Sequence, residues 1–95
     1  DPMTVLNDLS SLDPRLIVID RTPFSRDGMA RILTQHVPKS LGAASYPLWT
    51  LSRAALHDVL GERYRLLAEF PSDDAPIGAG RIRADYTGCI WLRKD

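Results

Sequence analysis

Apolar residues near the start of the chain recur at the spacing of an amphipathic helix. They repeat every three or four positions between Met3 and Leu12, as on a helix face that packs against a core. Asp1 can accept hydrogen bonds from free backbone N–H groups, and Pro2 suits the first helical position. A second Asp-Pro pair at positions 13 and 14 ends the run. The pattern predicts a short helix over residues 1–12.

An uninterrupted apolar run, Leu16 to Ile19, follows at once. It is too short for a buried helix and is typical of a strand covered on both faces, as parallel strands in α/β proteins are. The polar residues Asp20, Arg21 and Thr22 come next, and the proline and glycine of "TPFSRDG" indicate a loop. We therefore expect the strand to end at Asp20.

The middle of the chain is less regular. Residues 29–37, "MARILTQHV", could present one helical face or could run extended into Pro38, and we favour the extended interpretation. Residues 38–49, "PKSLGAASYPLW", have the composition of a loop.

A second helix is predicted after this loop. Thr50 or Ser52 can cap it, an apolar stripe extends from Leu51 to Leu60, and Gly61 stands where glycine usually ends helices. "RYRLLAEF" and "YTGCIWLR" then read as two strands of a hairpin with a long connection. The order helix, strand, long loop, helix, strand, strand predicts a mixed α/β fold containing a right-handed βαβ unit.

Composition and charge narrow the class of protein. With 95 residues, of which 44% are hydrophobic and 25% charged, the chain suits one small folded domain over residues 1–95. Twelve basic and twelve acidic side chains cancel, so nucleic-acid binding has little electrostatic support. No apolar run reaches the roughly 20 residues of a membrane span. Cys89 is the one cysteine, so we expect no disulfide, no metal cluster and a cytoplasmic location.

The order of elements resembles the carboxyl-terminal half of a class I S-adenosylmethionine-dependent methyltransferase, whose sheet ends in a helix, a fifth strand, a helix and a reversed hairpin. The stretches "IVIDRTPF", "QHVP", "ASYPLWTLSRAAL" and "YRLLAEF" are similar to a poorly characterised bacterial family of methyltransferase-like proteins. The resemblance covers nearly the whole chain. It implies a partial Rossmann-like sheet with a reversed C-terminal β-hairpin, in which the final strand lies between two others.

The features that hold the cofactor in that superfamily do not occur in this sequence. Its members carry a Gly-rich turn after the first strand and an acidic residue after the second. "IGAGRIRA", residues 77–84, contains only G-x-G and precedes no helix, so a hairpin connection is the better interpretation. Because the chain also begins with Asp1, we expect it to be the C-terminal part of a larger domain. S-adenosylmethionine would then bind the full-length parent, and no cofactor would bind this chain alone.

The resemblance also places candidate substrate residues. Ligands of open α/β sheets bind outside the carboxyl ends of the strands. This would bring Asp20, Arg21, Thr22 and Phe24 near a small-molecule methyl acceptor, with residues 25–49 folding over it as a lid. The alternative stays open that Asp20 and Arg21 only pair with neighbours and that Pro23 only turns the chain.

Three further residues have a chemical and a structural interpretation. His36 is the candidate general base, because its ordinary pKa of about 6.5 allows it to take a proton from an acceptor. Methyl transfer is a direct displacement that can proceed without a dedicated base, and a lone histidine in a loop is more often a hydrogen-bonding or packing residue. Tyr46 and Trp49 could form an aromatic wall for the acceptor or fix the loop to the sheet.

The aromatic residues of the two final strands, Trp91 and Phe70, are expected in the core, with Cys89 as a small apolar residue.

Two other functional classes remain. A non-enzymatic α/β module could associate with itself, because the strand over residues 16–19 would present an unpaired edge to another copy. A fragment of a small hydrolase has no positive support, since the sequence contains no G-x-S-x-G turn.

Overall fold

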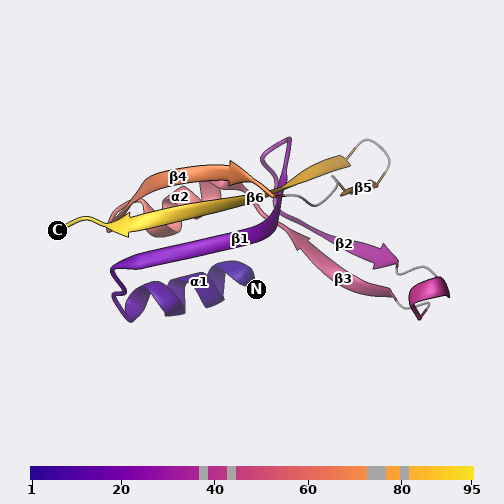
Figure 1. The fold of residues 1–95 in the computed structure, drawn as a ribbon, viewed down its shortest axis with the longest axis horizontal. Coiled ribbons are helices and arrows are strands. Elements are labelled where there is room, and N and C mark those ends of the chain that lie inside the picture. Colours follow the sequence, from indigo (N-terminus) through magenta and orange to yellow (C-terminus); the bar gives the residue numbers. More distant parts are fainter. Residues whose placement is uncertain (37–38, 43–44, 73–76, 80–81) are drawn as a thin grey trace.

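The computed structural model describes residues 1–36, 39–42, 45–72, 77–79 and 82–95, without the side chains of residues 35, 36, 39, 46, 77–79 and 82. These parts form a mixed α/β fold with two α-helices and two antiparallel sheets (Figure 1). In chain order the elements are α1 (Pro2–Ser11), β1 (Leu16–Ser25), β2 (Arg31–His36), a 3-10 helix η1 (Lys39–Leu41), β3 (Ser45–Thr50), α2 (Arg53–Leu60), β4 (Tyr64–Pro71), β5 (Ile77–Ala79) and β6 (Ile82–Arg93). Neither α-helix in these ranges is long and apolar enough to cross a membrane.

Both α-helices begin and end where the sequence predicts. The Asp1 side chain accepts a hydrogen bond from the Met3 N–H at 2.9 Å, and the Ser52 hydroxyl accepts one from the Ala55 N–H at 3.2 Å. Each cap satisfies a backbone donor that the first turn of a helix leaves free. α2 ends at Gly61, whose N–H donates to the carbonyl of His57.

The main sheet has the order β1–β6–β4, and β6 runs antiparallel to both neighbours. β1 and β4 are therefore parallel to each other, with the last strand of the chain between them (Figure 1). The predicted pairing of the two final long strands is confirmed. β5 pairs with the first residues of β6.

The core lies on one face of this sheet. Ile17 of β1 and Trp91 of β6 point to this face and pack with Leu6 of α1 and with Leu56 and Leu60 of α2. Both helices thus cover the same side, and α1 contacts α2. The other face carries the alternate residues of β1, and Val18 there is 57% exposed.

Two predictions about the connections were wrong. β1 does not end at Asp20 but continues to Ser25, so part of the expected loop is strand. Pro23 fits this strand because its nitrogen faces away from β6, where no ladder hydrogen bond is lost. The expected loop over residues 38–49 contains β3, which pairs with β2 in a two-stranded arm that projects from the main sheet (Figure 1). The extended interpretation of β2 is confirmed.

Candidate functional site

The polar residues that follow the apolar run of β1 form a β-bulge. Ile19 pairs with Cys89 and Thr22 pairs with Thr87, so two residues, Asp20 and Arg21, stand opposite the single residue Gly88. Bulges of this kind bend a strand and redirect its side chains, and they are frequent beside functional sites.

Side chains and an unusual backbone conformation hold the bulge in place. Arg21 has a φ of 50°, in the left-handed region that costs a residue with a Cβ about 1–2 kcal/mol. Its N–H donates to the Asp20 carboxylate at 2.8 Å, and the Thr22 hydroxyl donates to the Asp20 carbonyl at 3.0 Å. Asp20 therefore acts here as a local hydrogen-bond acceptor for the backbone.

Gly88 makes this packing possible. A Cβ at this position would lie 2.2 Å from Phe70 Cε2 and 2.8 Å from the Asp20 Oδ1. Phe70, expected in the core, is half-buried and lies against Gly88 on the face opposite the helices. The bulge, Gly88 and Phe70 lie side by side across the three strands, next to the residue at which β4 ends. The bulge in β1 is therefore close to the carboxyl end of β4.

The bulge turns Thr22 toward the helices. Residues three apart in a regular strand face opposite sides, but Ile19 and Thr22 pair with Cys89 and Thr87, which are two apart and share a face. Both side chains consequently border the same pocket.

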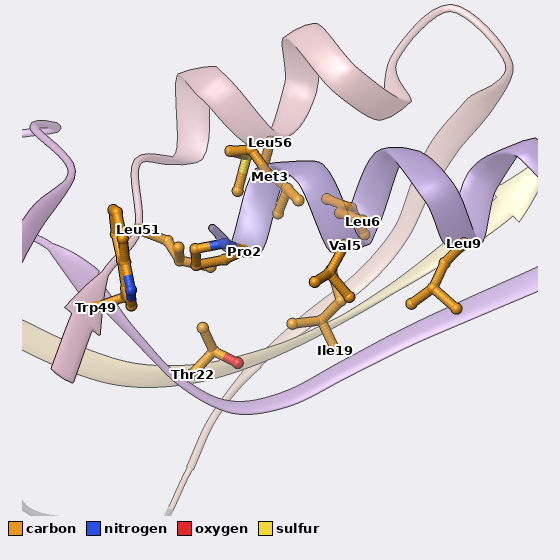
Figure 2. A pocket seen from close by; sticks show the side chains of 10 residues that line it. All are labelled: Pro2, Met3, Val5, Leu6, Leu9, Ile19, Thr22, Trp49, Leu51 and Leu56. Atoms are coloured by element: carbon orange, nitrogen blue, oxygen red, sulfur yellow. The ribbon is translucent and has the colours of Figure 1, made fainter. Parts of the chain in front are cut away.

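This pocket lies between α1, β1, the end of β3 and α2 (Figure 2). It has a volume of about 310 Å³, at the lower end of the range of small-molecule sites. Its walls are almost wholly apolar. The lining residues are Pro2, Met3, Val5, Leu6, Leu9, Ile19, Thr22, Trp49, Leu51 and Leu56.

The base of the β2–β3 arm fixes Trp49 at one end of the pocket. The neighbouring Thr50 is fully buried, and its hydroxyl accepts hydrogen bonds from the Ser25 hydroxyl at 2.9 Å and the Arg31 N–H at 3.1 Å. Backbone bonds between Leu51 and β1 join the arm to the main sheet. The indole of Trp49 is 38% exposed and stands across the pocket from Leu9 (Figure 2).

Phe24 does not border the pocket. Its side chain is 1% exposed in the core, and the guanidinium of Arg53 lies 5.1 Å from its ring centroid. Arg53 Nε also donates to Glu69 at 2.7 Å, which ties α2 to β4. The structure therefore gives Phe24 a packing role beneath α2.

The side chains of His36 and Tyr46 lie outside the described residues. Their backbones belong to the arm, where His36 pairs with Ser45 and Tyr46 with Gln35. His36 is five residues along β2 from Arg31, which pairs with Thr50 at the base. At about 3.3 Å per residue this is roughly 16 Å along the arm. Of the predicted site residues, Thr22 and Trp49 meet in the pocket, and Asp20 and Arg21 form the adjoining bulge.

Sequence reasoning missed Gly88 and the contribution of α1. An isolated glycine inside a strand pattern is a signal for a bulge or a close approach, and it could have indicated Gly88. The pocket face of α1 has no such signal, because Val5 and Leu9 follow the same periodicity as core residues.

Metal or thiol chemistry has no support among the described residues. No group of three or more potential metal ligands occurs in these ranges. Burial raises the pKa of the Cys89 thiol, which also accepts a hydrogen bond from the Trp91 indole N–H at 3.3 Å. A raised pKa disfavours the reactive thiolate.

Comparisons of this chain with protein-family models, with curated proteins and with solved structures found no match.

Proposed function

We propose that this chain is the acceptor-side part of a class I S-adenosylmethionine-dependent methyltransferase, and that the pocket between α1, β1 and β3 takes the methyl acceptor. The observation that carries the proposal is the position of β6, reversed between the parallel strands β1 and β4. The resemblance in sequence implies this order, which an ordinary βαβ unit followed by a hairpin does not require.

The placement of the pocket supports the same function. In open α/β sheets, ligands bind beyond the carboxyl ends of parallel strands. The bulge in β1 and the end of β4 lie at one level, opposite Gly88 and Thr87 of β6. Thr22 borders the pocket at this point, so a substrate bound there would lie beside the bulge of β1, close to the carboxyl end of β4.

The residues present suit an acceptor and do not suit the cofactor. S-adenosylmethionine supplies an electrophilic methyl group, and nucleotide sites of this type hold the ribose through a carboxylate after a Gly-rich turn. The pocket has no carboxylate among its lining residues. Cofactor binding would therefore require residues outside this chain. Within the chain, Trp49 and the apolar wall would orient the acceptor and exclude water, which can supply much of the acceleration of a direct displacement.

Calorimetric titration with S-adenosylmethionine tests the proposal. We expect no saturable binding to the 95-residue chain and clear binding, with methyl transfer, by the longer protein encoded in the natural reading frame. Micromolar binding by the short chain would contradict the assignment of sites. A longer protein that neither binds the cofactor nor transfers a methyl group would reject the methyltransferase function.

A second candidate is a self-associating, non-enzymatic module, and the open edge of β1 favours it. In the ladder with β6, the Arg93 N–H donates to the Arg15 carbonyl, so the backbone groups of Leu16 and Val18 point away from β6. Such an edge can pair with another copy. Sedimentation over a range of concentrations tests this, with Val18→Lys as an edge-blocking variant and Thr34→Lys, in the arm, as its control. A species that is monomeric at all concentrations would reject self-association.

A further inference from the structure

We infer that the pocket between α1, β1 and β3 binds a neutral, flat ring compound that carries a hydroxyl group, such as a simple phenol. Binding of this class of ligand rests on the pocket alone. Its identification as the methyl acceptor rests on the proposed function.

The absence of charge along the pocket requires a neutral ligand. None of the ten lining residues, all in the described part of the chain, has an ionisable side chain. A carboxylate or an ammonium group placed there would lose hydration without gaining an ion pair, which is strongly unfavourable. Charged amino acids, nucleotides and phosphate esters are therefore poor candidates.

The walls favour a flat ring. Aliphatic side chains of α1 and α2 form one side, and the indole of Trp49 stands at one end (Figure 2). Aromatic pairs prefer stacked or edge-to-face contacts and gain more than their buried area alone provides. An aromatic ring uses this wall better than an aliphatic chain of the same size does.

Two polar groups in the wall select a hydroxyl. The Thr22 hydroxyl donates its proton to the Asp20 carbonyl at 3.0 Å, so its oxygen can only accept a hydrogen bond from a ligand. The indole N–H of Trp49 can only donate, and within the described part of the chain no hydrogen bond of this group occurs. A ligand hydroxyl both donates and accepts, so it can satisfy either group, whereas an ether or a ketone cannot donate to Thr22.

The volume limits the ligand to about one substituted ring. Sites for drug-sized ligands span about 300–1,000 Å³, and this pocket of about 310 Å³ lies at the lower bound. A ligand of about ten heavy atoms in an open, mostly apolar site binds with a Kd on the order of 0.1–10 mM.

Amide chemical-shift titration of the 95-residue chain tests the inference. The probes are 4-ethylphenol, its methyl ether 4-ethylanisole, and 4-ethylbenzoate as the charged analogue. We expect saturable shifts at Met3, Thr22 and the Trp49 indole with 4-ethylphenol. We expect at least fivefold weaker binding of the ether and no saturation with the benzoate.

Matched variants separate the contributions. Thr22→Val should weaken the phenol to the level of the ether, and Trp49→Phe should keep the ring contact but remove the donor, with an intermediate loss. Thr34→Val, exposed on the arm, is the control and should leave binding unchanged. The dispersion of the same spectra reports whether each variant is folded.

Equal affinity for phenol, ether and benzoate, or no saturable shift with 4-ethylphenol, would overturn the inference. Phenol binding here without methyl transfer by the longer protein would reject the proposed function and leave the inference intact. Methyl transfer by the longer protein without phenol binding in this pocket would support the proposed function and overturn the inference.

Discussion

Gly88 is the residue whose replacement most directly tests the bulge in β1. A methyl group at this position would overlap the ring of Phe70, with 2.2 Å to Cε2 and 2.4 Å to Cζ. Because this ring lies at the end of a side chain, it can move at moderate cost. We expect Gly88→Ala to lower the free energy of unfolding by about 1–3 kcal/mol, the usual range for overpacking. Urea denaturation measures the change.

The Phe70→Leu background is the control for this prediction. Removing the ring removes its part of the overlap, so Gly88→Ala should cost less in the double variant than in the wild type. An equal cost in both backgrounds would place the conflict elsewhere, for example at the Asp20 carboxylate.

Asp27 provides a prediction about pH. Its carboxylate accepts hydrogen bonds from Arg31 Nη1 at 2.8 Å, from Arg31 Nη2 at 2.5 Å and from the Met29 N–H at 3.1 Å, and these bonds lower its pKa from 3.8 to about 2. A depressed pKa in the folded state means that this ion pair stabilises the fold above about pH 4. The contribution is lost as the pH falls from about 4 to 2.

A carbon-detected NMR titration of the Asp27 carboxyl tests this value. We expect a midpoint near pH 2 in the wild type and a return toward the ordinary value in Arg31→Gln. A midpoint near 3.8 in the wild type would show that the ion pair does not persist in solution.

Residue-level predictions from sequence succeeded where the signal is local. The caps Asp1 and Ser52 act on N–H groups two or three residues away, so short-range chemistry identifies them. The bulge at Asp20 and Arg21 depends on Gly88, nearly seventy positions later in the chain. No pattern within β1 itself contains that information.

At the scale of elements, the junction of the β2–β3 arm with the main sheet depends on Thr50. Its hydroxyl accepts hydrogen bonds from both the Ser25 hydroxyl and the Arg31 N–H, and Thr50 itself is fully buried. Thr50→Val keeps the shape but leaves both donors unsatisfied. We expect a loss of about 1–3 kcal/mol in the free energy of unfolding, measured by urea denaturation.

Thr34→Val, on the exposed part of the same arm, is the matched control and should change stability by less than about 0.5 kcal/mol. If both variants have the same small effect, the buried junction does not hold the arm. The position of Trp49 at the pocket would then need another explanation.

The arm also shows why one element was predicted and its partner was not. β2 has extended-type residues before a proline, whereas β3 contains Pro47, which we read as a loop signal. In a two-stranded arm each strand has an open side, so a proline nitrogen can face solvent without loss of a ladder bond. The pairing of β3 with β2 therefore outweighs the loop-like composition of the β3 sequence.

At the scale of the whole molecule, the order of strands was the least accessible feature. Hydrophobic periodicity predicted β1, β4 and β6 but carries no information about which strand is central. The resemblance in sequence supplied that expectation. The molecule measures 49 × 24 × 22 Å, because the arm continues outward from the main sheet (Figure 1).

Hydrogen exchange along β1 is the measurement that most directly tests the central proposal, namely that the sheet is open at β1 and that further strands complete it in a longer protein. The ladder geometry turns the amides of Ile17 and Ile19 toward β6 and those of Leu16 and Val18 outward. We expect slow exchange at Ile17 and Ile19 and fast exchange at Leu16 and Val18 in the 95-residue chain, with all four amides protected in the longer protein. Fast exchange at Leu16 and Val18 in the longer protein as well would show that no strand is added at this edge and would contradict the account.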